Sequence, residues 1–120
     1  KQIFTMKLGY WAFRGAGQIS RLSLAYSGLE WEDVKHVDRE KWQAEEKAGL
    51  GMDFPNLPYL IDGDFKLSES SAIPRYVLKK AGKTDALGKN AQDQARVDEL
   101  LGVLGDIRTA LVALFFDKEY

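Results

Sequence analysis

A tyrosine at the end of an expected strand is the residue of this chain whose type and place most directly suggest chemistry. Tyr10 stands between Gly9 and Trp11, at the end of a loosely alternating run over 5–11. A phenol keeps its proton at neutral pH and can donate it in a hydrogen bond. Donated to a sulfur, that hydrogen bond would favour the thiolate, which is the attacking form of a thiol. A tyrosine packed in the strand with its hydroxyl satisfied is the plainer alternative.

Residues 53–73 contain the features that could hold a small peptide. Pro58 follows Leu57 at the start of an apolar run over 57–61, which is typical of a buried strand. If the bond between these two residues is cis, the N–H and C=O of Leu57 turn outward and can pair with an extended ligand. From these two residues alone we expect the ordinary trans bond, because only about 5–6% of X-Pro bonds are cis.

An acidic residue and a serine open the helix expected over 70–81. The free N–H groups at a helix N-terminus and the Ser70 hydroxyl can bind a carboxylate, and Glu69 could bind an ammonium group. Plain capping of the helix by a serine is the common alternative. Together with Pro58, the pair indicates a site for a peptide that carries a free amine and carboxylates. If the thiol of that peptide meets Tyr10, the two segments together suggest glutathione.

Trp42 and Lys47 lie in a charged segment, 39–49, that we expect to be a short helix or irregular. As a pair, the indole N–H and the lysine charge could contact a carboxylate at the glycine end of the peptide. A solvated helix face with one packed tryptophan is an equally good interpretation.

Two other features have plainer interpretations. The run Gly15-Ala16-Gly17 begins like a dinucleotide-binding fingerprint, but Ser20 stands where the third glycine should be, so we reject that function. His36 is the only histidine of the chain, and it has no visible set of partners. We therefore expect it on the surface of a strand.

The elements that must position these residues follow a mixed α/β order. The expected strands cover 5–11, 31–37, 57–61 and 65–67, and the expected helices cover 18–27 and 70–81. Gly28 is a good end for the first helix, and Asp62-Gly63 is a hairpin signal. The order βαβ followed by ββα places helices on a mixed sheet, which predicts an α/β thioredoxin-like domain over 1–82.

A different pattern follows a polar linker over 83–90. From Asn90 onward, apolar residues recur at helical spacing, which predicts one long helix of roughly 28 residues. We expect 91–120 to be the incomplete beginning of an all-helical domain. Its stretch 111–116 is apolar on every side, so further helices of this chain or of another subunit must bury it.

The composition excludes several classes of function. The chain has 120 residues, a hydrophobic share of 45% and a net charge of -1, with 17 basic and 18 acidic residues interspersed. Because no basic stripe is present, we expect no nucleic-acid partner, and no apolar run approaches the ~20 residues of a membrane span. The chain has no cysteine, which excludes disulfides and thiolate metal sites, and we expect no metal.

Three segments of the sequence resemble the cytosolic glutathione S-transferases, the mu class above all. They are Gly9-Tyr10-Trp11-x-x-Arg14-Gly15, the highly specific string DFPNLPYLIDG at 53–63, and Ser70-x-Ala72-Ile73. The likeness extends over 7–120. It implies a thioredoxin-like glutathione-binding domain followed by a helical domain, in a homodimeric, cytoplasmic detoxification enzyme.

The resemblance also implies roles for single residues. Tyr10 matches the tyrosine that activates the thiol, and Asp106 matches an acidic residue that reaches the glutathione of the neighbouring subunit. The glutathione contacts of the family fall at Trp11, Trp42, Lys47, Asn56, Leu57, Pro58, Glu69 and Ser70. Compared with the mu class, one extra residue lies between Trp42 and Asn56, which makes Lys47 the weakest of these matches.

Further matches concern the dimer and the second substrate. Phe54 matches an aromatic key that inserts into the helical domain of the partner, and Arg75 falls at a dimer-interface position. Trp11 and Phe116 would line the electrophile pocket. Phe116 stands where mu enzymes often carry a tyrosine that assists carbonyl and epoxide substrates. The family subunit is also much longer than this chain.

The function expected from residues and resemblance together is glutathione transfer. Tyr10 would stabilise the thiolate of glutathione, the co-substrate, which attacks a small apolar electrophile. Two alternatives stay open. One is a non-catalytic, transferase-like structural subunit of a larger assembly, and the other is a glutathione-dependent isomerase with the same thiol site.

Overall fold

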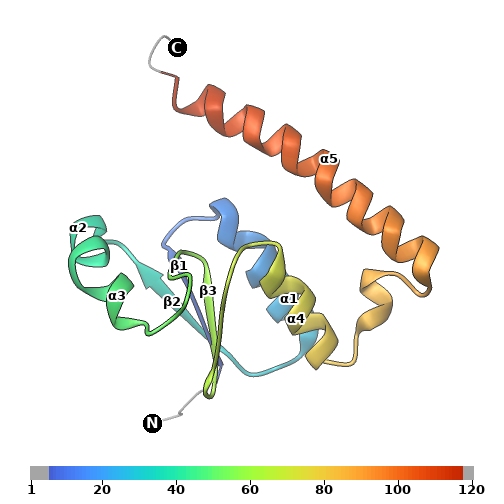
Figure 1. Cartoon of the computed structure of the whole chain (residues 1–120), viewed down its shortest axis with the longest axis horizontal. Helices are drawn as coiled ribbons and strands as arrows, with labels where there is room; N and C mark the ends of the chain where they lie inside the picture. The colour runs from blue at the N-terminus through green and yellow to red at the C-terminus, as the bar shows by residue number, and fades with distance from the viewer. Residues whose placement is uncertain (1–5, 118–120) are drawn as a thin grey trace. The chain divides into compact units, whose positions relative to one another are not determined.

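The computed structural model describes residues 6–117 of the chain (Figure 1). These residues fall into two compact units, one ending at Lys83 and the other beginning at Thr84. The first is an α/β unit, and the second consists of a short turn and one long helix. Position 5 of the first expected strand and positions 118–120 of the expected helical domain lie outside the described residues.

A four-stranded mixed sheet forms the centre of the first unit. Its order is β2 (Glu32–His36), β1 (Met6–Trp11), β3 (Tyr59–Asp62) and β4 (Phe65–Ser68). β1 and β2 are parallel, whereas β3 is antiparallel to both of its neighbours. The predicted order βαβ followed by ββα, and with it the thioredoxin-like α/β class, is confirmed.

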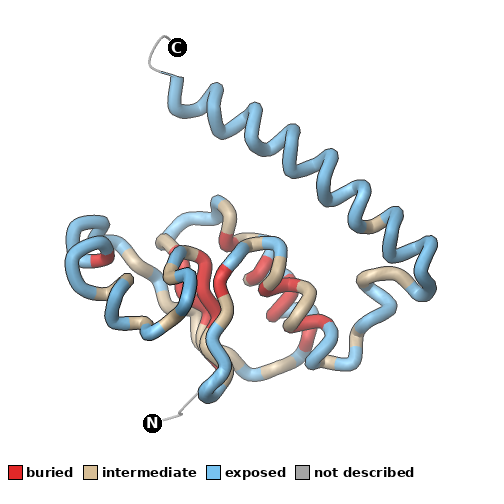
Figure 2. Tube along the Cα trace, in the orientation of Figure 1, coloured by how far each residue is buried: buried red, intermediate tan, exposed pale blue. Residues whose placement is uncertain are grey.

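Two helices, α1 (Gln18–Ser27) and α4 (Ala72–Lys80), cover one face of this sheet (Figure 1). Figure 2 shows buried positions gathered on the strands and on these two helices, and the core includes Leu8, Leu24, Leu60, Ile73 and Val77. Burying an aliphatic side chain of this size contributes roughly 1.5–3 kcal/mol. α1 ends as predicted at Gly28, whose φ of 74° is readily adopted only by glycine.

The chain between β2 and β3 lies on the opposite face of the sheet, as Figure 1 shows. It forms three short pieces, which are α2 (Arg39–Lys41), the π-helix η2 (Trp42–Glu46) and α3 (Lys47–Gly49). Trp42 is the only buried residue in these three pieces. The expected short helical segment is therefore present, but the wide π turn in its middle was not predicted.

The hairpin between β3 and β4 turns one residue later than predicted. Asp62 still pairs with Phe65 in the antiparallel ladder, so the two turn residues are Gly63 and Asp64 and not Asp62 and Gly63. Gly63 has a φ of 60° whereas Asp64 has no positive φ, which fits a type II′ turn with glycine at its first central position. The glycine was correctly identified as part of the turn, and only its place within the turn differs.

The second unit contains the 3₁₀ turn η3 (Thr84–Leu87) and the long helix α5 (Ala91–Phe115). α5 has 25 residues, which corresponds to about 37 Å at 1.5 Å per residue. Asn90 caps its start, because the Asn90 side-chain oxygen accepts the N–H of Asp93 at 2.9 Å. The apolar side chains of α5 are mostly exposed within the described residues, so the helical domain expected around them stays a prediction.

A buried serine in α1 gives a first testable consequence of the packing. Ser20 is fully buried, and its hydroxyl has no hydrogen-bond partner among the described residues. An unsatisfied buried hydroxyl costs about 1–3 kcal/mol, and alanine favours a helix more than serine does. We expect Ser20→Ala to raise the free energy of unfolding by about 1 kcal/mol, measured by urea denaturation.

The matched control for this substitution is Ser23→Ala in the same helix. The Ser23 hydroxyl donates to the Ile19 carbonyl oxygen at 2.8 Å, so its removal should bring no gain in stability. Equal changes in the two variants would show that the Ser20 hydroxyl is satisfied in solution.

An ion pair between β3 and α4 gives a pH-dependent consequence. The Asp62 carboxylate accepts a hydrogen bond from the Tyr76 hydroxyl at 2.6 Å and another from Lys80. Partial burial alone would raise the Asp62 pKa, but the Lys80 and Tyr76 hydrogen bonds and the Lys80 charge outweigh burial and lower this pKa. The stabilisation is thus present above the unfolded-state pKa of about 4 and is lost as pH falls through the folded-state pKa.

We therefore expect Asp62→Asn to lower the free energy of unfolding at pH 7 but to have little effect at strongly acidic pH. Urea denaturation of both proteins across this pH range measures the difference. A difference between the proteins that does not change with pH would show that the charge of Asp62 does not stabilise the fold.

Candidate functional site

Tyr10 lies at the C-terminal end of β1 and is 6% exposed. Its hydroxyl oxygen accepts the backbone N–H of Ala16 at 2.9 Å. No described residue accepts a hydrogen bond from the Tyr10 hydroxyl. A phenol whose oxygen already accepts one hydrogen bond keeps its proton for another acceptor. The tyrosine is thus packed, as the plainer alternative proposed, and yet its donor remains available to a ligand.

Two glycines make room for this phenol. A Cβ atom at Gly15 would lie 2.6 Å from the Tyr10 hydroxyl oxygen, and one at Gly17 would lie 2.4 Å from Cγ of the same ring. Side chains at these positions would collide with Tyr10. The sequence analysis correctly rejected the glycine pair as a nucleotide fingerprint but did not recognise this role. A Gly-x-Gly turn a few residues after a strand-end tyrosine is the signal that could have indicated it.

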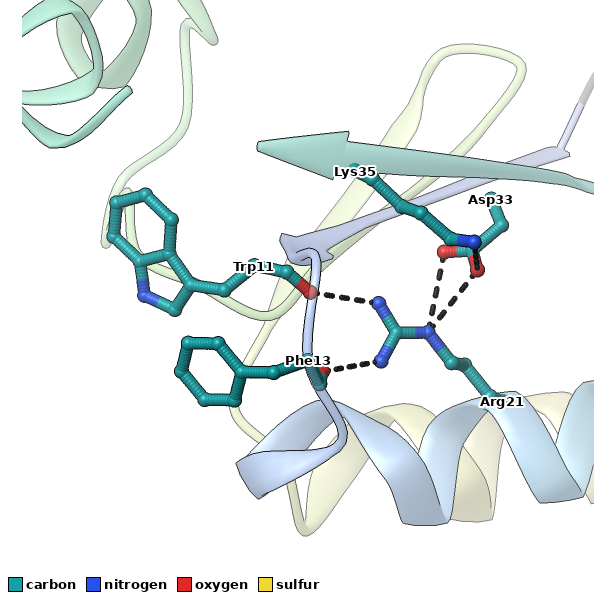
Figure 3. A network of polar contacts seen from close by, with 5 residues as sticks. All are labelled: Trp11, Phe13, Arg21, Asp33 and Lys35. Carbon is teal, nitrogen blue, oxygen red and sulfur yellow. Dashed lines mark hydrogen bonds and ion pairs between the residues drawn. The ribbon is translucent and has the colours of Figure 1, made fainter. Parts of the chain in front are cut away.

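The loop after β1 is held by one arginine from α1 (Figure 3). Arg21 donates to the carbonyl oxygen of Trp11 at 2.9 Å and to that of Phe13 at 2.7 Å. Its Nε also donates to the Asp33 carboxylate on β2, with distances of 3.1 and 3.2 Å to the two oxygens. One side chain therefore ties the end of β1 and the loop that follows it to both α1 and β2. The sequence analysis did not identify Arg21.

The Leu57–Pro58 bond is cis in the structure, although the two residues alone favoured trans. Pro58 is buried, whereas Leu57 is half-buried and precedes β3. The N–H of Leu57 donates to the side-chain oxygen of Asn56 at 2.9 Å. The two predicted site residues Asn56 and Leu57 are thus in direct contact in this turn.

The turn before α4 contains an unusual backbone conformation. Glu69 has a φ of 81°, the only positive φ among the described residues that are not glycine. Its carbonyl oxygen accepts the N–H groups of Ala72 and Ile73, both at 3.1 Å. Ser71 occupies the N-cap position without a side-chain capping bond, so the plain serine cap is not found. A strained residue of this kind costs of order 1–3 kcal/mol and is frequent at ligand sites.

A group of aromatic and polar side chains covers the face of the sheet opposite α1 and α4. We call Trp11, His36, Trp42, Glu46 and Tyr59 the second-face cluster. The Trp42 ring is 2% exposed and stacks on Tyr59, with centroids 6.1 Å apart and planes at 7°. Trp42 also meets the rings of His36 and Trp11 edge to face, at 5.1 and 6.4 Å. The indole of Trp42 is therefore a packed tryptophan, as the alternative interpretation held.

His36 is half-buried, and its side chain points into this cluster, which corrects its expected place on the strand surface. Its side chain is 9% exposed, with Nδ1 at 2.9 Å from a Glu46 carboxylate oxygen and Nε2 at 3.1 Å from the Tyr59 hydroxyl. Burial raises the pKa of the Tyr59 hydroxyl above its ordinary value, and the charges of Glu46 and Glu32 raise it further. The partners of His36 come from η2 and β3, so neighbouring residues in the sequence gave no sign of them.

The comparisons with known proteins identify the family. Residues 6–79 match the family described as "Glutathione S-transferase, N-terminal domain". This range is more than half of the chain and includes Tyr10, the second-face cluster and the turn at Glu69. The chain belongs to the glutathione S-transferase family.

Relatives within this family include mu-class transferases. The chain is 41% identical over 122 residues to Glutathione S-transferase Mu 2 of Macaca fuscata fuscata, which covers 96% of this chain and 54% of the relative. It is 42% identical over 116 residues to the class-mu 26 kDa isozyme of Schistosoma mansoni, with 95% and 57% covered. The predicted resemblance to the mu class is confirmed, and the chain spans about half the length of these relatives.

Solved structures of the family support the fold. The glutathione S-transferase from Ascaris lumbricoides superposes with a TM-score of 0.75 at 33% identity, over 92% of this chain and 50% of that one. The prostaglandin synthase D of Nilaparvata lugens superposes with a TM-score of 0.76 at 30% identity, over 96% and 54%.

A π turn lies in the segment between Trp42 and Asn56, where the sequence analysis expected one extra residue relative to the mu class. In η2, the N–H of Lys47 donates to the Trp42 carbonyl oxygen, five residues earlier. A π turn adds one residue to a helical turn. Lys47 therefore lies one turn after Trp42. In a regular α-helix, the residue four positions after Trp42 would occupy that place. The extra residue leaves Trp42 and Lys47 on the same side of the segment.

The remaining predicted residues belong to other elements of the chain. Phe54 is 78% exposed in the turn before β3, and Arg75 is half-buried on α4. Asp106 on α5 and Phe116 just after it are exposed residues of the second unit. Among residues 6–117, no group of histidine, aspartate and glutamate side chains could hold a metal ion, and no helix is long and apolar enough to cross a membrane.

Proposed function

We propose that this chain forms the glutathione-activating part of a glutathione transferase, with Tyr10 as the catalytic residue. The observation that supports this most strongly is the state of the Tyr10 hydroxyl, which accepts from Ala16 and has a proton to donate. Donated to the sulfur of glutathione, this proton stabilises the thiolate over the thiol. The thiolate then forms a bond to the electrophilic carbon of an apolar substrate, and the leaving group of that carbon departs with the bonding electrons.

Glutathione would lie extended along the backbone of Leu57. The Leu57 N–H would then donate to the ligand in place of the Asn56 side-chain oxygen. The γ-glutamyl carboxylate would bind at Ser70, in the turn at the start of α4, and the free amine beside Glu69. The positive φ of Glu69 and the missing serine cap support a ligand at this turn. Lys47 and the indole N–H of Trp42 would hold the carboxylate at the glycine end.

The second substrate and the assembly belong to the same proposal. A small apolar electrophile would bind beside Trp11, and Phe116 keeps the pocket role that the family resemblance implies. Two copies would form a homodimer through Phe54 and Arg75, with Asp106 reaching the glutathione of the other subunit. The relatives are named glutathione S-transferases, and we propose that this chain serves detoxification by conjugation in the cytoplasm.

The first test of the proposal is a titration of the purified chain with glutathione, followed by tryptophan fluorescence. Trp11 and Trp42 lie at the proposed site, whereas Trp31 packs against the core on the other face. We expect a saturable change that becomes smaller in Trp11→Phe and in Trp42→Phe. No change in a chain shown to be folded by circular dichroism would contradict the proposal.

A conjugation assay with an activated aryl halide then separates the alternatives. Formation of the thioether supports transfer. Saturable binding without a conjugate, for a panel of apolar electrophiles, would favour the non-catalytic subunit or the isomerase.

A further inference from the structure

We propose that His36 is a positioning residue for glutathione, acting through Glu46 and Trp42 and not by contact with the reacting atoms. The inference rests on the proposed function, in which Trp42 and Lys47 hold the carboxylate at the glycine end. His36 would fix the distance between that pair and the Leu57 backbone. None of the roles implied by the family resemblance falls on His36.

The segment 39–49 depends on a small number of side chains for its place on the sheet. Trp42 is its only buried residue, and Glu46 is its carboxylate that reaches β2. Arg39 adds a third contact, with its guanidinium 5.7 Å from the centre of the Trp11 ring. His36 contacts both of the stronger attachments, because its ring meets Trp42 at 5.1 Å and its Nδ1 meets Glu46 at 2.9 Å.

The orientation of the His36 ring is determined from both sides. A neutral ring donates from Nδ1 to the Glu46 carboxylate and accepts the Tyr59 hydroxyl proton at Nε2, whereas a protonated ring donates from both nitrogens. Both contacts therefore persist in either charge state. A ring with a hydrogen-bond partner at each nitrogen has less rotational freedom than an apolar side chain of the same size. The apolar side chain packs without a fixed direction.

Tyr59 connects this arrangement to the other wall of the proposed site. It follows Pro58 directly in the chain, its hydroxyl meets His36, and its ring stacks on Trp42. The chain of contacts from Tyr59 through His36 to Glu46 thus links the start of β3 with η2. Lys47 is the residue that follows Glu46, so a shift of Glu46 moves Lys47 relative to Leu57.

The test compares two peptides in the full chain and in its His36→Leu variant. Glutathione carries the glycine and its carboxylate, whereas γ-glutamylcysteine lacks the glycine. Loss of the hydrogen bond to the Glu46 carboxylate should weaken glutathione binding by about tenfold. The affinity for γ-glutamylcysteine should stay the same, because the Ser70 and Tyr10 ends of the site are unaffected.

Conservative variants and a control sharpen the measurement. His36→Asn, whose amide can still donate to Glu46, should recover part of the glutathione affinity. If His36→Leu does not fold, Glu46→Met removes the same hydrogen bond from its other partner at similar size and should show the same selectivity. Tyr76→Phe is the control, because it removes a hydroxyl that bonds to Asp62 on the face of the sheet covered by α1 and α4. This variant should change the affinity for neither peptide.

Hydrogen exchange without any peptide measures the segment itself. In His36→Leu, the amides of 39–49 should exchange faster, while those of α1 and α4 should not. Equal weakening of both peptides, or no weakening of either, would overturn the inference while leaving the proposed function intact. Wild-type protein that binds neither peptide would overturn the proposed function first, and unchanged exchange in 39–49 would overturn the positioning role separately.

Discussion

Replacing Tyr10 by phenylalanine should lower the rate of conjugation about ten- to a hundredfold at pH 6.5. A hydrogen bond to a charged acceptor contributes about 1.5–3 kcal/mol, which is one to two units in the pKa of the bound thiol. At a pH below the pKa of the bound thiol, a rise of one to two units in this pKa lowers the concentration of the attacking thiolate ten- to a hundredfold. The ring remains between Gly15 and Gly17, so glutathione affinity should be unchanged.

The measurement is a pH profile of the conjugation rate, together with the ultraviolet absorbance of the bound thiolate. In Tyr10→Phe, both transitions should move to higher pH. Tyr26→Phe is the matched control, because it removes a hydroxyl from the exposed side of α1. A Tyr10→Phe protein that loses glutathione affinity while keeping the wild-type pH profile would mean that Tyr10 is structural.

Replacing Arg21 by methionine should destabilise the fold by about 3 kcal/mol. The change removes the donors to the carbonyl oxygens of Trp11 and Phe13 and leaves Asp33 without its closest cation. A partly buried carboxylate and two backbone acceptors then lose their partners, which costs more than the loss of an exposed ion pair. The loop that follows Trp11 should also become mobile, so turnover should fall as well.

Urea denaturation gives the change in stability, and the conjugation rate gives the change in turnover. Arg21→Lys should recover only part of the loss, because an ammonium group cannot reproduce the planar set of guanidinium donors. Arg14→Met, on the exposed loop nearby, should change stability by less than about 0.5 kcal/mol. An Arg21→Met protein as stable as the wild type would show that the network of Figure 3 contributes nothing.

The parts of the fold that the sequence predicted depend on local patterns. The apolar positions of α1 recur at helical spacing and end at Gly28, and both features depend only on neighbouring residues. The apolar run over 57–61 predicted the strand β3 in the same way, although Leu57 and Pro58 alone favoured the trans bond that the structure does not have. The place of the hairpin was wrong by one residue, because the pairing of Asp62 with Phe65 is decided by the register of two strands.

The parts that the sequence did not predict depend on contacts between distant residues. His36 appeared to have no partners, since Glu46 and Tyr59 reach it from η2 and β3. Arg21 looked like one more charged residue of α1, since its acceptors are backbone carbonyls that every residue carries. The spacing of residues within one element cannot reveal either arrangement.

Gly9 has a consequence for how this sequence can change over evolutionary time. A Cβ atom there would lie 2.0 Å from the Tyr59 ring, which stands across from Gly9 in the ladder between β1 and β3. Any larger residue at position 9 thus requires a smaller one at position 59. The two positions should covary in an alignment of relatives that keep this cluster, and a screen of paired variants should recover activity only where the two volumes are exchanged.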